Sequence, residues 1–215
     1  MYAMYIHNLY IKITVLFLFL LCFLSVTASA QNVDIDILKS INPHNPTSGY
    51  WSATSSSAYW LSGGAAFGTL AYGLIKKDRS AQYNAYEMFL GIGISTAISE
   101  VLKVSIDRVR PADEYPNEIF VTRPIHGRAF PSGHTTLAFT TATALSLEYK
   151  KWYIVVPAYL WAGSVGYSRM YKGYHAPSDV LSGAAVGIGS GYLSHWLSKK
   201  IFKLGEKRRQ DMAFN

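Results

Sequence analysis

Three short clusters in the second half of the chain combine cations, histidines and glycines at spacings that suit the binding of an anion. In the first, Lys103 and Arg110 lie seven residues apart, two turns of a helix, so we expect both on one helix face. Pro111 follows at once and is expected to end that helix. Arginine offers a planar fork of donors to phosphate oxygens, and lysine a compact charge. This cluster therefore predicts a site for an anionic group.

The second cluster, Pro131-Ser132-Gly133-His134, stands directly before an apolar run. Serine is a residue type that caps helices through its hydroxyl oxygen, so Ser132 is expected to act as a cap. Gly133 has no side chain, which lets a ligand approach the backbone N–H groups. Because those groups and the helix dipole favour negative charge, the cluster predicts a helix N-terminus that faces an anion.

The third cluster runs from Ser168 and Arg169 to His175 and Asp179. His175 precedes Asp179 by four residues, and Pro177 between them suits the first turn of a helix. Asp179 would then hydrogen-bond one imidazole nitrogen and leave the other free as a nucleophile. The cluster predicts an activated histidine close to a cation.

In this order, the patterns KxxxxxxRP, PSGH and SRxxxxxHxxxD resemble the signature of the type 2 phosphatidic acid phosphatase superfamily. That superfamily includes membrane lipid phosphatases, soluble bacterial acid phosphatases and vanadium haloperoxidases. The resemblance covers residues 103–179, and every fixed position of the three patterns is matched. The matching residues are Lys103, Arg110, Pro111, Pro131, Ser132, Gly133, His134, Ser168, Arg169, His175 and Asp179.

The resemblance implies a role for each of these side chains. His175 would take the phosphoryl group as a phosphohistidine, and Asp179 would orient it. His134 would be the general acid for the leaving alkoxide and then the base for water. The implied phosphate-binding residues are Lys103, Arg110, Ser132, Gly133, Ser168 and Arg169. No metal or other cofactor is expected, because phosphoryl transfer mainly requires positioning and fixed positive charge.

The composition favours a membrane protein over other classes. Of the 215 residues, 50% are hydrophobic and 15% charged, whereas a soluble domain has about 25% charged residues. This excludes a disordered chain, a collagen and a coiled coil. Cys22 is the only cysteine, which excludes a disulfide scaffold. The net charge of +7 suits a membrane surface or a nucleic acid, and the low charged fraction favours the membrane.

The N-terminus has the pattern of a signal peptide. Lys12 precedes an uncharged apolar run at 13–26, and Ala28-Ser29-Ala30 follows as a small-x-small cleavage site. We predict a signal peptide over 1–30, cleaved after Ala30. The alternative is an uncleaved signal anchor.

The rest of the chain predicts an all-α helical bundle with about five membrane-spanning helices. Residues 31–57 are polar and are expected to form an exported loop with a short amphipathic turn around 35–41. The apolar segments are 58–75, 81–102, 132–149, 152–168 and 179–198. Each is long enough to cross a bilayer, which needs about 17–25 helical residues. Residues 58–198 would be the helical domain, and 199–215 a basic cytoplasmic tail.

The charges predict the orientation of these spans. If residue 31 is outside, the ends that face the cytoplasm carry pairs of lysines, as the positive-inside rule requires. These pairs are Lys76-Lys77, Lys150-Lys151 and Lys199-Lys200. The three clusters then share the exported side. We expect a multi-pass protein of the cell membrane with its active site on the exported (periplasmic or extracytoplasmic) face, no nucleic-acid partner and no obligate protein partner.

The predicted function is the removal of phosphate from a lipid phosphate at that face. The candidate lipids are phosphatidic acid, phosphatidylglycerol phosphate, undecaprenyl diphosphate and a lipid A phosphate. One alternative is a soluble exported acid phosphatase of the same superfamily, and a vanadium haloperoxidase is another. A membrane protein that binds lipid phosphates without catalysis is a third.

Four residues outside the patterns also carry predictions. Glu100 lies one turn before Lys103 and is expected to position it. Arg108 is expected to pair with Asp107 or Asp113. Glu87 is expected to face the bundle interior or lie near a span end. His195 is expected at a surface or interface, away from the site.

Overall fold

The computed structural model describes residues 30–213, and the predicted signal peptide lies outside this range except for Ala30. The described residues form helices and connecting loops, with no strand among them. The helices are α2 (Ala30–Ile41), α3 (Gly49–Ile75), α4 (Arg79–Ile106), α5 (Pro111–Glu114), α6 (Gly133–Tyr149), α7 (Trp152–Tyr171) and α8 (Pro177–Ala213). The expected all-α architecture is therefore present over this part of the chain.

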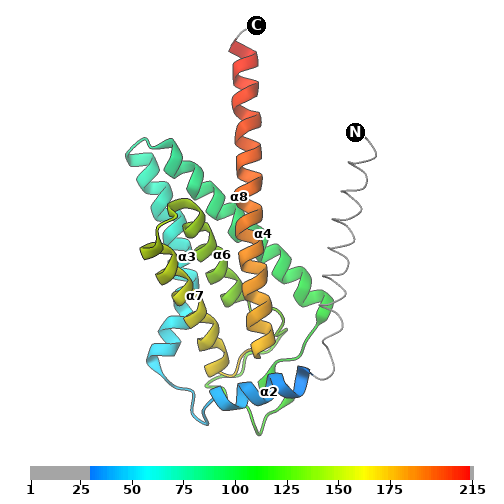
Figure 1. The fold of residues 1–215 in the computed structure, drawn as a ribbon. Helices are drawn as coiled ribbons and strands as arrows, with labels where there is room; N and C mark the ends of the chain where they lie inside the picture. The colour runs from blue at the N-terminus through cyan, green and yellow to red at the C-terminus, as the bar shows by residue number, and fades with distance from the viewer. Residues whose placement is uncertain (1–29, 214–215) are drawn as a thin grey trace.

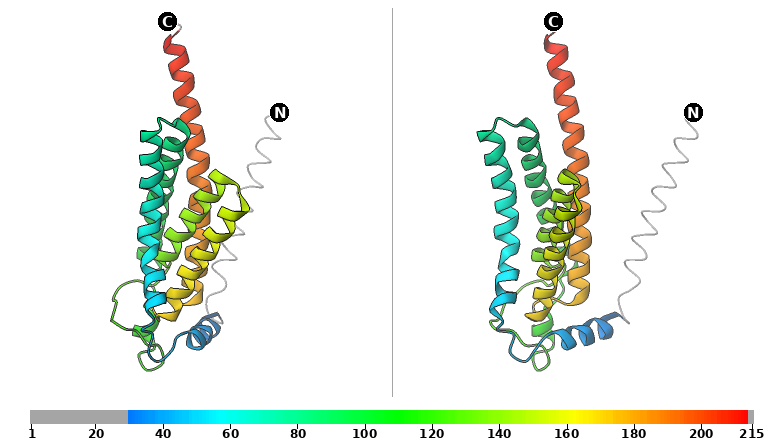
Figure 2. Two further views of the ribbon diagram at one scale, coloured as in Figure 1. Left: turned by 90° about the vertical axis from the view of Figure 1, so that its left-hand side faces the viewer. Right: turned by 60° about the vertical axis from the view of Figure 1, so that its left-hand side comes forward.

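Five long helices form a bundle, and a short one crosses its end. Helix α6 is central, since it packs against α3, α4, α7 and α8. Helix α2 lies across the end of the bundle at which α8 begins, as Figures 1 and 2 show. At the other end α8 continues past its neighbours. All three predicted clusters lie in or next to the end that α2 covers.

Small residues let the helices approach closely. Gly183 and Gly187 lie one turn apart on α8 and face α6. A Cβ at Gly187 would stand 2.5 Å from the Thr136 carbonyl oxygen, and one at Gly183 would stand 2.7 Å from that of Ser132. Any larger residue would therefore push α8 away from the start of α6, where two of the predicted clusters meet.

The polar region 31–57 is not the loop that the sequence predicted. Helix α2 replaces the short turn expected around 35–41, and α3 begins at Gly49 rather than at residue 58. Ser48 caps α3 by accepting a hydrogen bond from the Trp51 N–H. Within α3, Ser55 and Ser62 are buried one turn on either side of Ala58. The Ser-rich stretch misled the prediction because small polar residues also suit a tightly packed helix face.

The first cluster also differs from its prediction. Helix α4 ends at Ile106, where Asp107 adopts the left-handed conformation of a helix C-cap. Lys103 is therefore in the last turn of α4, whereas Arg110 lies beyond the helix, at the N-cap position of α5. The two do not share a helix face. Pro111 begins α5 instead of ending α4.

One described helix passes a test of length and composition for a membrane span. It is the helical stretch Arg79–Glu114, and 17% of its most apolar 18-residue window is buried inside the bundle. The predicted segment 81–102 lies inside it. The other four predicted spans stay predictions.

Candidate active site

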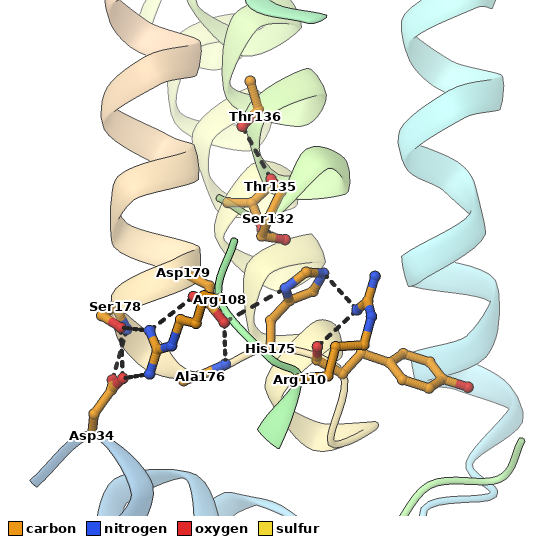
Figure 3. A network of polar contacts seen from close by, with 11 residues as sticks. Asp34, Arg108, Arg110, Ser132, Thr135, Thr136, His175, Ala176, Ser178 and Asp179 are labelled. Carbon is orange, nitrogen blue, oxygen red and sulfur yellow. Dashed lines mark hydrogen bonds and ion pairs between the residues drawn. The ribbon is translucent and has the colours of Figure 1, made fainter. Parts of the chain in front are cut away.

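The three clusters meet at the α2 end of the bundle. The loop after α4 supplies Arg110, the start of α6 supplies Ser132, and the turn between α7 and α8 supplies His175 (Figure 3). The backbone joins two of the clusters directly, because the Ser132 N–H donates to the Asp179 carbonyl oxygen at 3.0 Å. The chain therefore brings together residues up to 76 positions apart, from Lys103 to Asp179.

His175 is buried between a carboxylate and a guanidinium. Its Nδ1 lies 3.7 Å from Asp179 Oδ2, within ion-pair range but too far for a hydrogen bond. Its Nε2 lies 3.5 Å from Arg110 Nη1. Arg110 Nη1 also donates to the Tyr174 carbonyl oxygen at 3.0 Å, which fixes the guanidinium beside the ring. One ring nitrogen thus faces Asp179 and the other faces a cation (Figure 3).

The site keeps the His175 imidazole neutral. Burial lowers the pKa of His175 to about 4 from its ordinary 6.5; Asp179 opposes this shift, and Arg169 and Arg110 add to it. His175 lies in the loop between α7 and α8, outside the predicted spans. A neutral imidazole keeps a lone pair on its unprotonated nitrogen, so the side chain can act as a nucleophile at neutral pH.

We expect the His175 ring to stay unprotonated as the pH falls through 6.5 and to gain its proton only near pH 4. The depressed pKa means that the proton binds the folded protein later than it binds an ordinary histidine. NMR of isotope-labelled imidazoles in detergent measures this, with His175→Ala to assign the signal. Titration of that signal near pH 6.5 would contradict the geometry described.

Asp179 is held on both carboxylate oxygens. Arg108 Nη1 donates to Oδ1 at 2.9 Å, and the Ala176 N–H donates to Oδ2 at 2.9 Å. The side chain is fully buried. Two fixed donors leave the carboxylate little freedom to rotate, so its position relative to His175 is set by the protein.

Two guanidinium groups at the site keep unused donors. Arg169 is 5% exposed, its Nη1 donates to the Ser55 hydroxyl at 2.7 Å, and it stacks on the Tyr174 ring. The Nε atoms of Arg169 and Arg110 are buried and have no partner among the described residues. Buried N–H groups without an acceptor are rare in folded proteins. An anion between the two guanidinium groups would satisfy both.

Lys103, in the last turn of α4, is the third cation of the predicted site. Its Nζ donates to Glu100 Oε1 at 2.8 Å, which confirms the expected contact between these residues. A Cβ at Gly133 would lie 3.4 Å from the same Nζ, so the ammonium lies against the start of α6. A cavity of about 100 Å³ between α3, α4 and α6 adjoins both residues.

The start of α6 presents a hydroxyl and an imidazole. Ser132 stands at the N-cap, as predicted, but its side chain makes no capping hydrogen bond. Its oxygen instead accepts from the Thr135 hydroxyl at 2.9 Å. This bond uses the oxygen as an acceptor and leaves the Ser132 proton to donate elsewhere. His134 is half-buried, and its ring lies edge-on to Tyr59 at 4.7 Å.

The hydroxyl of Ser168 is occupied by a hydrogen bond within its own helix. The residue is fully buried, and its hydroxyl donates to the Val165 carbonyl oxygen within α7 at 2.6 Å. The proton of this hydroxyl is therefore engaged in the helix. A contact between Ser168 and phosphate stays a prediction.

Comparison with known proteins identifies the family. Residues 84–203, more than half of the chain, match the PAP2 superfamily. The chain belongs to the PAP2 superfamily. The matched region contains all the residues of the three clusters.

Two curated PAP2 relatives cover different shares of their own length. The chain is 38% identical over 117 residues to a lipid A 1-phosphatase of Porphyromonas gingivalis, which is 53% of this chain and 24% of that protein. It is 25% identical over 181 residues to a lipid A 4'-phosphatase of Bacteroides thetaiotaomicron, which is 80% of this chain and 79% of that protein. The chain thus spans about a quarter of the first relative and most of the second.

Two solved PAP2 structures share the helical arrangement. LpxE of Aquifex aeolicus superposes with a TM-score of 0.62 at 30% identity, covering 75% of this chain and 94% of that chain. A PAP2 type phosphatidylglycerolphosphate phosphatase of Bacillus subtilis gives 0.66 at 23% identity, covering 88% and 96%. The bundle therefore has the fold of PAP2 membrane phosphatases.

The sequence analysis overlooked Asp34 and assigned the wrong partners to Arg108. Arg108 pairs with neither Asp107 nor Asp113. Its Nη2 donates to Asp34 Oδ2 at 2.8 Å, and its Nη1 reaches Asp179. Asp34 belongs to α2, so the pair joins residues 74 positions apart. One feature of the sequence could have indicated a role for Asp34. The carboxylate stands beside Ile35 on the buried face of an amphipathic helix, where an aspartate rarely lies without a partner.

His195 was expected at a surface or interface but is largely buried in the bundle. Its Nδ1 lies 2.8 Å from Glu87 Oε1, and both side chains are mostly covered. This contact explains how Glu87 sits inside the helical bundle, since a polar partner accompanies it. The pair is separate from the three clusters.

Proposed function

We propose that the chain is a lipid phosphatase that works through a phosphohistidine at His175. The observation that carries this proposal is the neutral, buried imidazole of His175 beside two guanidinium groups with unused donors. A nucleophile needs its lone pair, and a phosphoryl group needs positive charge around its equatorial oxygens. The names of the relatives, lipid A 1-phosphatase and lipid A 4'-phosphatase, support a lipid phosphate as the substrate class.

In the proposed reaction, His175 Nε2 attacks phosphorus while the bond from phosphorus to the lipid oxygen breaks. His134 gives its proton to the departing alkoxide, so the lipid leaves as an alcohol. Neutral His134 then takes a proton from water, whose oxygen attacks the phosphohistidine and releases inorganic phosphate. Asp179, whose Oδ2 lies 3.7 Å from Nδ1, stabilises the positive charge that the imidazole gains on phosphorylation, and the charge on the phosphoryl oxygens is met by Arg110, Arg169 and Lys103. We include Ser132, Gly133 and Ser168 as further contacts.

We also propose the membrane orientation that the charges predict, with five spans after a signal peptide and the site on the exported face. Large apolar side chains on the outside of the bundle support this arrangement. Trp60, Ile75 and Leu160 are 80%, 78% and 67% exposed. The main buried cluster is by contrast mostly alanine. Small residues inside and large apolar ones outside are typical of helices packed within lipid.

A larger cavity, of about 580 Å³, lies elsewhere in the bundle and does not suit an anion. Its lining includes Asp78, Glu148 and Tyr149, near the end of α3, the start of α4 and the end of α6, where two of the lysine pairs lie. Carboxylates repel phosphate, and the guanidinium groups lie at the α2 end. We therefore assign the reaction to the cationic residues at the α2 end of the bundle.

The test is phosphate release by the purified protein from the four candidate lipid phosphates in detergent micelles, with and without EDTA. We expect release from at least one lipid and the same rate in EDTA, because the cations of the site are side chains. Loss of activity in EDTA that added metal restores would contradict the proposed chemistry. Release from water-soluble phosphate esters alone would favour the acid phosphatase alternative.

A further inference from the structure

A network of polar contacts connects the N-terminal helix α2 to the third cluster and so to the candidate nucleophile. Asp34 on α2 is 8% exposed and accepts two hydrogen bonds from Ser178, from its N–H at 2.8 Å and from its hydroxyl at 2.5 Å. Arg108 donates to the same carboxylate and, through its other terminal nitrogen, to Asp179 (Figure 3). One guanidinium therefore bridges a carboxylate of α2 and the carboxylate beside His175.

Asp34, although it belongs to α2, also caps the N-terminus of α8. The first N–H groups of a helix have no partner within it, and α8 begins at Pro177. The Ser178 N–H is one of these groups, and Asp34 satisfies it. A carboxylate at this end also complements the helix dipole. Asp34 thus fixes the turn of α8 that carries Asp179.

Helix α2 is anchored firmly enough to hold this position. Leu38 is fully buried and packs with Ile35 against Ile119 in the 115–131 region. Directly after α2, the Asn42 amide donates to the Phe120 and Tyr171 carbonyl oxygens at 2.9 Å each. The contacts of Asp34 are therefore part of a docked helix rather than of a free chain end.

We infer that Asp34 and Arg108 are positioning residues, which hold Asp179 in the orientation that places His175 for attack. The inference rests on the proposed function and adds two residues that the family patterns do not contain. The fork of Arg108 is essential to it, because one nitrogen must reach Asp34 while the other reaches Asp179. A lysine has the charge but cannot bridge the two.

The kinetic test compares Asp34→Asn and Arg108→Lys with the wild type on dioctanoyl phosphatidic acid in micelles. Asp34→Asn leaves Arg108 paired with Asp179, so no buried charge is stranded. We expect kcat to fall about tenfold in each variant with KM and thermal stability little changed, since misplacement by about 1 Å can cost up to about 10²-fold. The double variant should lose no more than the worse single one.

Two controls separate positioning from general loosening of α2. Asp36→Asn removes the same charge from an exposed residue two positions away. Lys39→Ala breaks the surface ion pair of α2 with Glu118. Both should keep the wild-type kcat. Equal losses in Asp34→Asn and Asp36→Asn, or full kcat in Arg108→Lys, would overturn the inference.

A second readout does not depend on turnover. The charged and titratable groups that face His175 are Asp179, Arg110, Arg169 and His134. Adding Arg108→Gln to the Asp34→Asn variant removes the positive charge that Arg108 places beside Asp179. The negative charge of Asp179 then acts more strongly on the His175 ring. The NMR titration of His175 should then move up by about half a pH unit or more relative to Asp34→Asn alone.

An unmoved titration would overturn the inference, even in a protein found inactive on every lipid phosphate. Inactivity of the wild type on all lipids would sink the proposed function instead. The two failures are therefore distinguishable.

Discussion

His175→Ala is expected to reduce phosphate release by about a thousandfold or more, because it removes the atom that attacks phosphorus. The remaining cations of the site would still bind phosphate, so KM should change far less than kcat. The measurement is steady-state phosphate release from the lipid that the wild type prefers. Near-UV circular dichroism in the same detergent checks that the variant is folded, since His175 is buried.

A matched control for this substitution is His44→Ala. His44 is exposed and lies against Phe120, in the loop between α2 and α3. The same change of residue type should leave turnover at the wild-type rate. If folded His175→Ala keeps a substantial part of the wild-type rate, another group attacks phosphorus and the proposed mechanism is wrong.

His134→Ala is expected to slow turnover of a lipid phosphate by about 10²–10⁴-fold, the usual contribution of a general acid or base. The factor by which the variant slows the bond-breaking step should depend on the leaving group. An alkoxide needs a proton as it departs, whereas nitrophenolate is stable without one. In the first turnover, the variant should therefore release nitrophenolate from nitrophenyl phosphate far faster than it releases lipid alcohol.

Burst kinetics on the two substrates measure this difference. The comparison variant is His175→Ala. Its activity on both substrates should fall by a similar factor, because either leaving group departs only when the nucleophile attacks phosphorus. Equal first-turnover losses on both substrates in His134→Ala would mean that His134 does not protonate the leaving group.

The sequence predicted the residues of the candidate site but not the contacts from α2 that hold them in place. His175 and Asp179 face each other as their spacing predicted, although at 3.7 Å they form an ion-pair contact and not the expected hydrogen bond, and Pro177 begins the helix. The contact of Glu100 with Lys103 is equally local. By contrast, Asp34 reaches Arg108 across 74 positions, and no periodicity in one sequence specifies such a pair.

The errors have a physical pattern. Arg110 was assigned to the face of Lys103 on the assumption that α4 continues to Pro111, but Asp107 ends the helix in a left-handed turn. Arg110 nevertheless reaches His175, since the extended segment after the turn leads back to the site. The start of α3 was missed because Ser55 and its neighbours were taken as loop residues. In this bundle, such small residues form the packed face.

The proposed phosphohistidine can be observed directly in His134→Ala. Without its base for water, the variant should accumulate the intermediate when given nitrophenyl phosphate, as phosphorylation proceeds and hydrolysis is slow. The measurement is mass spectrometry of peptides after an alkaline quench, with the His134→Ala/His175→Ala double variant as the blank. We predict a phosphoryl group on His175 that approaches one per protein and is missing from the blank. Release of nitrophenolate without any phosphorylated His175, or with phosphate on another residue, would contradict the account.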